Sequence, residues 1–564
     1  LADMPGIPHV KIGRVDEYFA RLEGRVWADP RLPVWNGELY LEYHRGTYTS
    51  QAQQKRNNRK LEFLLHNAEL YAALAGIMTG AEYPRPALDE AWEIVLRNQF
   101  HDIIPGSSIR PVYEESAVEY QAARELAGGA LAEAEASLTS VMDLAEASLV
   151  VFNPTGVNRS DLVEVELPEG TVPVDEEGLP LPTQGKLVYA VDVPANGYRA
   201  YPLRPFVGAG ASGRLTVTPA LVETPHFRIE LNGAGQIARL YDRVQNREVL
   251  APGRAANVLQ AFEDKPMHYD AWDIDIYYSQ KCREVTDLVE ATVEEAGPER
   301  GVLRLVWRFE DSTITQRMTV YARTPRIDFD THVDWQQSQV LLKAAFPVEV
   351  HATRATYEIQ FGNVERPTHW NTSWDWARFE SVGHKWADLS EGGYGVSLLN
   401  DCKYGYDIKD NVLRLTLIKS AISPDPKADR GEHRFTYSLF PHAEDWYRGG
   451  TVAQGYRLNN PLTAVVESAH RGTLPAVFSL VSCAAPNVMV ETVKAAESGQ
   501  GLVVRVYEFG NRRGPVELLF GRPIASAVET NLLEQEPRPV SWQGHRLPFE
   551  VTPYAIRTFV VTLK

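Results

Sequence analysis

With 564 residues, the chain is too long for a single hydrophobic core, which stops growing at roughly 250 to 300 residues, so we expect about three to five domains. Its hydrophobic share of 44% and charged share of 23% are typical of a globular protein and argue against a mostly disordered chain. The formal charge of −17, without a basic patch in the sequence, argues against binding to nucleic acid or to an anionic membrane surface.

The cysteines and the first residues bear on the cellular compartment. Cys282, Cys402 and Cys483 lie far apart without CxxC spacing, so the sequence predicts neither a disulfide framework nor a cysteine zinc site. A reducing, cytoplasmic environment is the corresponding expectation. No stretch reaches the roughly 20 apolar residues that span a bilayer, and residues 1–10 lack the regions of a signal peptide. Because the chain begins with Leu, we expect its natural start to lie outside it.

Three helices are predicted in the first part of the chain. Apolar residues recur at helical spacing over residues 50–76, with Ser50 as a candidate N-cap and Gly76 as a candidate C-cap. A second helix is predicted over residues 89–100, ending before Pro105, and an Ala-, Glu- and Leu-rich third over residues 111–144. The three amphipathic patterns predict a helical bundle.

Strands are predicted from residue 149 to the end of the chain. Short Val, Leu and Tyr runs alternate there with Gly, Pro and Asn-Gly turns. Residues 227–231 and 237–240 flank an Asn-Gly-Ala-Gly sequence, which predicts a hairpin. The small, flexible residues 207–213 are a candidate linker. The predicted fold class is therefore α+β multidomain, with a three-helix bundle followed by predominantly antiparallel β-sandwich domains.

Residues 97–108 contain the densest cluster of unusual polar residues in the helical part. His101 and Asp102 lie near the predicted end of the second helix, where an imidazole nitrogen could ligate zinc and the carboxylate could accept hydrogen bonds from sugar hydroxyls. The alternative is a capping or surface pair, which is the commoner role of a single His-Asp at a helix end.

Residues 38–50 crowd aromatic, basic and hydroxyl groups together just before the first helix, and include His44 and Arg45. Such a mixture suits carbohydrate recognition, because rings stack on the apolar faces of sugars and polar groups orient the hydroxyls. A strand with a solvated face followed by an N-cap is the alternative.

In their order, spacing and helical context, these two clusters resemble the middle domain of the glycoside hydrolase family 38 α-mannosidases. The resemblance extends along nearly the whole chain. Further matching segments are residues 263–266, 270–275, 360–363, 371–375, 400–406, 431–433 and 507–514.

The resemblance implies a domain organisation. The expected parts are the tail of a largely absent catalytic α/β barrel domain (1–30), a helical middle domain (31–147), a small β domain (148–207), a large β-sandwich domain (214–460) and a C-terminal β domain (461–564). Residues 1–27 resemble the last strand and helix of that barrel, so they are expected to have a structural role as scaffold and no catalytic one.

The resemblance also implies a zinc-dependent retaining hydrolysis of α-mannosides, with a nucleophilic Asp and a second carboxylic acid. His101 is then expected to be a zinc ligand and Asp102 a partner of mannose hydroxyls. His44 and Arg45 match positions that line the mannose pocket, although some relatives have a tryptophan in place of His44. Trp272 and Asp273 are placed on a loop that could reach the sugar.

No catalytic residue is expected in this chain, because the family takes its nucleophile and its other zinc ligands, including a His-x-Asp pair, from the N-terminal barrel. The His-x-Asp at residues 268–270 lies in the β half and is interpreted as unrelated to the metal. The chain alone is therefore expected to be inactive and to bind zinc weakly.

Three functional interpretations stay open at this point. The first is a C-terminal enzyme portion that acts on α-mannoside oligosaccharides together with the absent N-terminal segment. The second is a self-standing carbohydrate-binding or assembly module with no catalytic role. The third is a nicked enzyme whose pieces stay associated. No nucleic-acid or membrane partner is expected, and a homo-oligomer is compatible with each interpretation.

Overall fold

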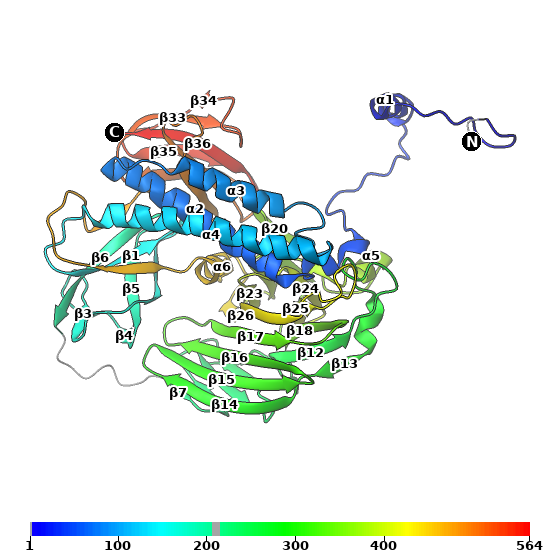
Figure 1. Ribbon diagram of the computed structural model, residues 1–564, viewed down its shortest axis with the longest axis horizontal. Helices are drawn as coiled ribbons and strands as arrows, with labels where there is room; N and C mark the ends of the chain where they lie inside the picture. The colour runs from blue at the N-terminus through cyan, green and yellow to red at the C-terminus, as the bar shows by residue number, and fades with distance from the viewer. Residues whose placement is uncertain (1–2, 206–214) are drawn as a thin grey trace. The chain divides into compact units, whose positions relative to one another are not determined.

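The computed structural model of the chain describes residues 3–205 and 215–564, so the predicted linker at 207–213 lies outside the described residues. The chain divides into two compact units, Leu1–Leu41 and Glu42–Lys564. The described part of the first unit contains one helix, α1 (Val15–Val26), within the segment interpreted as scaffold. The second unit contains the helical bundle and all the sheets (Figure 1).

The predicted three-helix bundle is confirmed, because α2 (Ala52–Thr79), α3 (Arg85–Asn98) and α4 (Arg110–Thr139) lie side by side (Figure 1). Their shared core is apolar and excludes water, as the helical spacing of these residues predicts. Its most deeply buried members are Leu61, Leu65, Ala68, Leu88, Ala91, Val95, Tyr120, Ala123 and Ala127.

The ends of α2 differ from the predicted ones. Gly76 lies inside the helix, and Gly80 ends it in the left-handed conformation (φ 77°), with its N–H donating to the Gly76 carbonyl oxygen. Ser50 is not the N-cap, because its hydroxyl donates to the Ala271 carbonyl oxygen instead (2.6 Å). Gln51 takes the N-cap position with a φ of 56°.

Helix α4 also ends earlier than predicted, at Thr139 rather than at residue 144. The backbone beyond it forms β-bridges instead, between Met142 and Leu474 and between Leu144 and His470. Pairing with a distant segment therefore ends the helix where composition alone would continue it.

The small β domain consists of two sheets around the apolar core that contains Leu149, Val188 and Tyr201. Two of its strands, β27 and β28, come from beyond residue 460 and pair with β1 and β6. One sheet contains β27 (Thr463–Glu467), β1 (Ser148–Asn153), β6 (Gly197–Pro205), β28 (Val477–Ser479) and β3 (Thr171–Pro173), and the other β2 (Arg159–Glu164), β5 (Leu187–Val193) and β4 (Thr183–Gln184).

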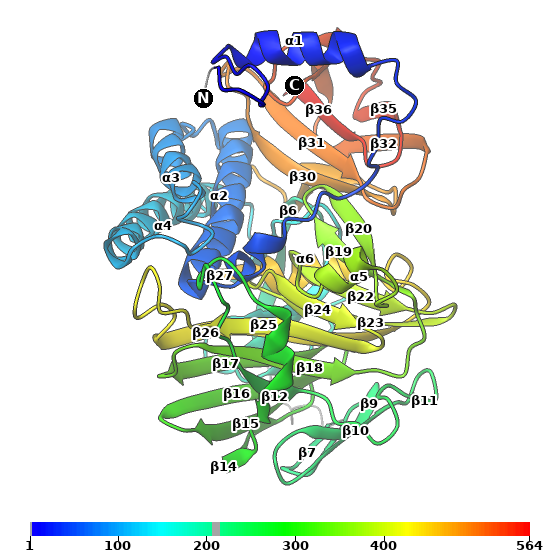
Figure 2. The same ribbon diagram turned by 90° about the vertical axis from the view of Figure 1, so that its right-hand side faces the viewer.

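The large β domain packs three antiparallel sheets around one extensive core (Figure 2). The predicted hairpin is confirmed, since the strands at 227–231 and 237–242 pair antiparallel. The nine-stranded sheet contains β14 (Asp287–Ala296), β15 (Arg300–Phe309), β16 (Ser312–Tyr321), β17 (Ile327–Trp335), β26 (Gly431–Ala443), β23 (Tyr394–Asn400), β22 (Trp386–Ser390), β19 (Arg354–Ile359) and β20 (Gly362–Pro367). The six-stranded sheet contains β13 (Cys282–Glu284), β12 (Val258–Glu263), β18 (Val340–Pro347), β25 (Val412–Lys419), β24 (Gly405–Lys409) and β21 (Ser381–Val382). The five-stranded sheet contains β11 (Arg247–Glu248), β10 (Ile237–Asp242), β9 (Phe227–Leu231), β8 (Leu221–Glu223) and β7 (Thr216–Val217).

The C-terminal part is a sandwich whose core continues into the second half of α2. Its strands are β30 (Val488–Ala495), β31 (Leu502–Glu508), β36 (Ile556–Leu563), β33 (Ile524–Thr530) and β34 (Arg538–Pro539) in one sheet, and β29 (Val481–Cys483), β32 (Gly514–Phe520) and β35 (Arg546–Val551) in the other. The short helices are η1 (Glu42–His44), η2 (Gly46–Tyr48), η3 (Ile276–Gln280), α5 (Ser373–Ala377) and α6 (Thr451–Asn459). The α+β class with antiparallel sheets is thus confirmed.

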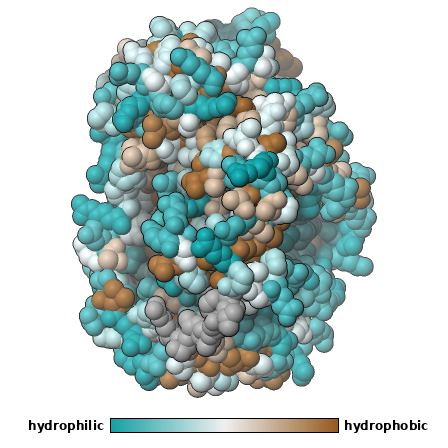
Figure 3. Space-filling model, turned by 90° about the vertical axis from the view of Figure 1, so that its left-hand side faces the viewer, coloured by the Kyte–Doolittle hydropathy of each residue, from teal (hydrophilic) through white to brown (hydrophobic). Residues whose placement is uncertain are grey.

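The surface shows scattered hydrophobic side chains among hydrophilic ones on the face seen in Figure 3. Within the described ranges, no helix combines the length and the apolar character needed to cross a bilayer. The three cysteines are free, with Cys402 buried and Cys282 exposed.

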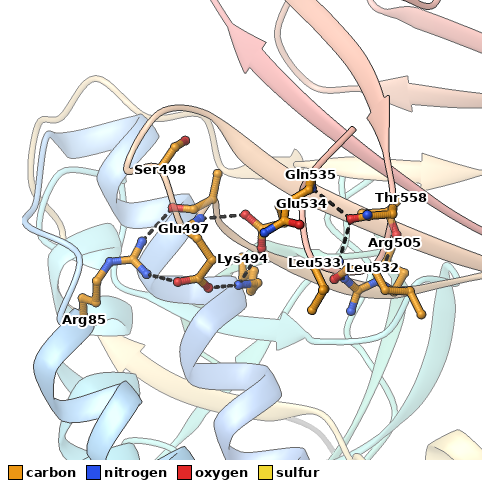
Figure 4. A network of polar contacts seen from close by, with 12 residues as sticks. Arg85, Lys494, Glu497, Ser498, Arg505, Leu532, Leu533, Glu534, Gln535 and Thr558 are labelled. Atoms are coloured by element: carbon orange, nitrogen blue, oxygen red, sulfur yellow. Dashed lines mark hydrogen bonds and ion pairs between the residues drawn. The ribbon is translucent and has the colours of Figure 1, made fainter. Parts of the chain in front are cut away.

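A polar network joins the bundle to the C-terminal sandwich (Figure 4). Arg85, at the start of α3, donates to the Ala496 carbonyl oxygen (2.7 Å) and pairs with Glu497 (3.0 Å). Lys494 on β30 in turn bonds to Glu497 and lies 2.9 Å from a carboxylate oxygen of Glu534. The network anchors α3 at its first turn.

Next to this network, burial raises the pKa of Glu69 on α2 to about 7, although the charge of Lys494 opposes the shift. A carboxyl whose pKa is raised on folding contributes stability below its unfolded pKa and loses it as the pH rises through the folded value. We therefore expect Glu69→Gln to raise the unfolding temperature relative to the native chain at pH 8 but not at pH 4.5. Thermal unfolding at both pH values measures this, and Glu133→Gln, at an exposed position on α4, should show no such difference.

Candidate functional site

Arg45 lies at the centre of the junction between the bundle and the large β domain. Its side chain is buried between η1 and η2, in the loop that leads into α2. The guanidinium donates to the Ala377 carbonyl oxygen from Nε (3.1 Å) and Nη2 (2.9 Å), and to Oδ1 of Asp273 from Nη1 (3.3 Å). It also stacks on the ring of Phe379. Arg45 thus joins the α2 entry loop to α5 and to the 270–275 loop.

Asp273 is as deeply buried as Arg45. Burial raises the pKa of this carboxyl, while the Ile274 N–H (2.8 Å) and Arg45 oppose the shift. Arg45 and Asp273, each predicted to contact the sugar, are therefore brought into direct contact with one another. Both side chains already form hydrogen bonds with other protein groups. Arg45 and Asp273 therefore hold the 270–275 loop in position.

The backbone of the 270–275 loop packs directly on the entry loop. Gly46 and Thr47 both donate their N–H groups to the Trp272 carbonyl oxygen, at 2.8 and 3.3 Å. A Cβ at Gly46 would lie 3.0 Å from the Ala271 and Asp273 carbonyl oxygens, which is unusually tight, so glycine favours this approach. The half-buried ring of Trp272 packs against a small alanine cluster and meets Tyr269 edge to face.

His44 is half-buried at the end of η1. Its Nδ1 is buried and has no hydrogen-bond partner among the residues that the structure describes. Such a nitrogen can still form a hydrogen bond with a water molecule or with a ligand group at this position. His44 thus stays available for a polar contact, unlike Arg45 beside it.

The loop that contains His101 and Asp102 reaches the same junction through Gly106. A Cβ at Gly106 would lie 2.1 Å from the Ser50 carbonyl oxygen, and Gly106 has a φ of 85°. Asp102 is itself in the left-handed conformation (φ 68°). Its Oδ1 accepts a hydrogen bond from the Ser107 hydroxyl (2.7 Å), and its carbonyl oxygen accepts one from the Tyr113 hydroxyl (3.1 Å). These contacts hold the Asp102 carboxylate in a defined position.

The His101 side chain is exposed, and its ring contacts that of Phe100 at 4.0 Å between centroids. It lies outside the apolar core of the helical bundle. Throughout residues 3–205 and 215–564, no group of three or more His, Cys, Asp or Glu residues is arranged to hold a metal ion. Because zinc takes three or four protein ligands, the described residues do not by themselves fit a zinc ion.

Sequence reasoning missed the buried ion pairs beneath the junction. Lys419 on β25 pairs with Asp264, and both side chains are almost completely buried. A Cβ added at Gly46 would lie 2.5 Å from the Lys419 Cε, so this ion pair packs directly against the loop that leads into α2. The only signal in the sequence is a lysine at an inward-facing position of an apolar strand, where a charge needs a partner.

A second missed residue is Asp429, which caps α2 from the large β domain. Its carboxylate accepts the N–H groups of Gln51 (2.6 Å) and Ala52 (2.7 Å). Burial raises the pKa of Asp429 and lowers that of the neighbouring Lys55, whose ammonium donates to the Ser50 carbonyl oxygen. Nothing near Gln51 in sequence indicates this cap, because 378 residues separate the two.

Comparison with known proteins places these domains. Residues 42–138 match the family described as alpha mannosidase middle domain, residues 222–427 the Glycosyl hydrolases family 38 C-terminal domain, and residues 487–559 the Glycosyl hydrolases family 38 C-terminal beta sandwich domain.

Individual relatives agree with these matches. The chain is 34% identical over 579 aligned residues to Alpha-mannosidase 2C1 of Homo sapiens, which covers 100% of this chain and 54% of the relative. It is 32% identical to Alpha-mannosidase G of Dictyostelium discoideum, covering 99% of this chain and 55% of that protein. The chain thus spans about half the length of these curated relatives.

The crystal structure of an alpha-mannosidase from Enterococcus faecalis V583 has the same fold, with a TM-score of 0.82 at 18% identity. The match covers 97% of this chain and 72% of that one. With the three domain matches and the similarity to the human protein along the whole of this chain, the chain belongs to glycoside hydrolase family 38, as its helical middle domain followed by its C-terminal β-sandwich domains.

Proposed function

We propose that this chain is the C-terminal portion of an α-mannosidase and contributes one wall of its sugar site. The observation that carries the proposal is the 34% identity along the whole chain to a protein named as an α-mannosidase. The geometry of the junction supports the proposal. Residues 44–50, 97–108, 270–275 and α5 meet there through short hydrogen bonds and through close contacts at glycines. Its substrate would be an α-mannoside oligosaccharide, and its compartment a reducing one such as the cytoplasm.

In this proposal, each group at the junction has a distinct role. Asp102, held by Ser107, accepts hydrogen bonds from mannose hydroxyls, and His44 offers its orphaned Nδ1 to another polar group of the sugar. The half-buried ring of Trp272 stacks on an apolar face of the sugar. Arg45 and Asp273 keep the loops at the correct distance from one another.

Zinc enters this proposal only through His101. Its exposed imidazole supplies a single donor, and the remaining donors and the nucleophile would come from a polypeptide segment outside residues 1–564. The corresponding expectations are weak zinc binding by the isolated chain and no turnover without the segment that carries the nucleophile.

The experiment compares this chain with the longest natural polypeptide that contains it, using 4-nitrophenyl α-mannoside and metal analysis. We expect nitrophenol release and one bound zinc only in the longer polypeptide. There, His101→Ala should lower the zinc content and reduce activity by more than the roughly 10- to 100-fold typical of losing an outer partner of a metal ligand.

The matched control in that polypeptide is His268→Ala, since His268 is also exposed but belongs to the unrelated His-x-Asp sequence. It should leave zinc content and activity unchanged. Turnover by the isolated chain, or equal effects of the two substitutions, would contradict the proposal. Specific sugar binding without turnover in the longest polypeptide would instead support a carbohydrate-binding module.

A further inference from the structure

Arg159, the first residue of β2, has a buried guanidinium without a partner. The residue is 3% exposed, and its Nε, Nη1 and Nη2 atoms all lack a hydrogen bond to any residue that the structure describes. Buried arginine is ordinarily paired, because a buried charge without compensation strongly destabilises the fold. Five N–H donors that point at no protein acceptor therefore require another acceptor.

The charges around Arg159 do not cancel. The pKa of Arg159 is lowered to about 10, chiefly by burial and also by Arg457 and Arg326, while Asp161 opposes the shift. Arg326 is already neutralised by Asp328, through bonds of 2.7 and 2.9 Å. Asp161, two residues along the strand, accepts the Leu162 N–H on its Oδ1 and makes no ion pair with Arg159. The buried charge of Arg159 is therefore left without an ion pair among the described residues.

Helix α6 presents two more unpartnered groups toward buried space. The Nε of Arg457 and the Oε1 of Gln454 are both buried without a hydrogen bond among the described residues. These residues are three positions apart and so share one face of the helix. An amide can be turned to present its nitrogen, because its two orientations have nearly the same shape. The helix therefore offers donors of the same kind as Arg159.

We propose that Arg159 and Arg457 bind a small monovalent anion, of the size and charge of chloride, between the small β domain and α6. The unpaired buried charge of Arg159 sets the sign of the ligand's charge, and the absence of an acceptor for its three nitrogens sets the ligand's position. The neighbouring cavity of about 350 Å³ is lined by Asn158 but not by Arg159, so the guanidinium does not face a space that would admit a sugar or a nucleotide.

The anion would act as a structural link. Helix α6 lies between the small β domain and the large β domain (Figure 1), and its other residues pack on Trp386 and Leu399 of the large domain. An anion shared by Arg159 and Arg457 would join β2 to this helix and so join the two domains through it. This inference is independent of the proposed mannosidase activity, because it involves neither the junction around Arg45 nor His101.

Thermal unfolding at constant ionic strength tests the proposal, with chloride replaced stepwise by gluconate. For the native chain we expect an increase of roughly 2 to 4 °C as chloride saturates the site. Arg159→Met should abolish the increase and should unfold at a higher temperature than the native chain in chloride-free buffer, because it removes an unpaired buried charge. Arg239→Met, at an exposed arginine on β10, should keep the full chloride response.

A crystal structure of the native chain grown with bromide supplies a second measurement that does not depend on the folding of any variant. We expect one anomalous peak within hydrogen-bonding distance of the Arg159 guanidinium. An ordered water there with no anomalous signal, or a chloride response that Arg159→Met retains, would overturn the proposal.

Discussion

Replacing Gly106 by alanine is expected to destabilise the chain by about 2 to 5 kcal/mol and to displace the loop that contains His101 and Asp102. About 1 to 2 kcal/mol comes from forcing a side chain into the left-handed backbone conformation, and about 1 to 3 kcal/mol from the clash. The added Cβ would lie 2.1 Å from the Ser50 carbonyl oxygen, and a backbone atom cannot move aside as a flexible side chain can. Denaturant unfolding measures the total effect.

Gly80→Ala is the matched control for this substitution. Gly80 has a φ of 77°, close to the 85° of Gly106, but nothing lies within 4 Å of its added Cβ. It should therefore show only the conformational cost, and the difference between the two variants isolates the contact with Ser50. Equal destabilisation by the two substitutions would mean that the 97–108 loop is not held against the entry of α2.

Replacing Asp429 by alanine is expected to destabilise the chain by about 3 to 5 kcal/mol, because two buried N–H groups and a buried ammonium lose their compensation together. The N–H groups belong to Gln51 and Ala52, and the ammonium to Lys55. Helix α2 would then begin without a cap, and the loop with Arg45 would lose its anchor. Hydrogen exchange at residues 44–55 and denaturant unfolding measure the two effects.

Two further variants separate these contributions. Asp425→Ala removes a neighbouring carboxylate that bonds only to the Gln51 side chain and to one local N–H, and should cost about 1 to 2 kcal/mol. Lys55→Met in the Asp429→Ala background should recover part of the stability, because the unpaired ammonium is removed. If the double variant is no more stable than Asp429→Ala, the cost comes from the cap alone.

The sequence by itself determined the features that depend on local pattern. Helical spacing between Leu61 and Ala75 predicted α2, and an Asn-Gly turn between alternating strands predicted the 227–242 hairpin. These predictions succeed because side-chain period and turn chemistry act over a few residues. The resemblance to family 38 likewise rested on short segments, and the domain matches confirm it.

The helix ends and the buried supports of the junction were decided by the tertiary structure. The sequence predicts Ser50 as an N-cap, yet its hydroxyl donates to the Ala271 carbonyl oxygen. The carboxylate of Asp429 caps the helix instead. Strand β27 completes the small β domain by pairing with β1, more than 300 residues earlier in the chain. The physical reason is common to all of these cases: a buried polar group or an open strand edge must find a partner, but its chemistry does not specify where in the sequence that partner lies.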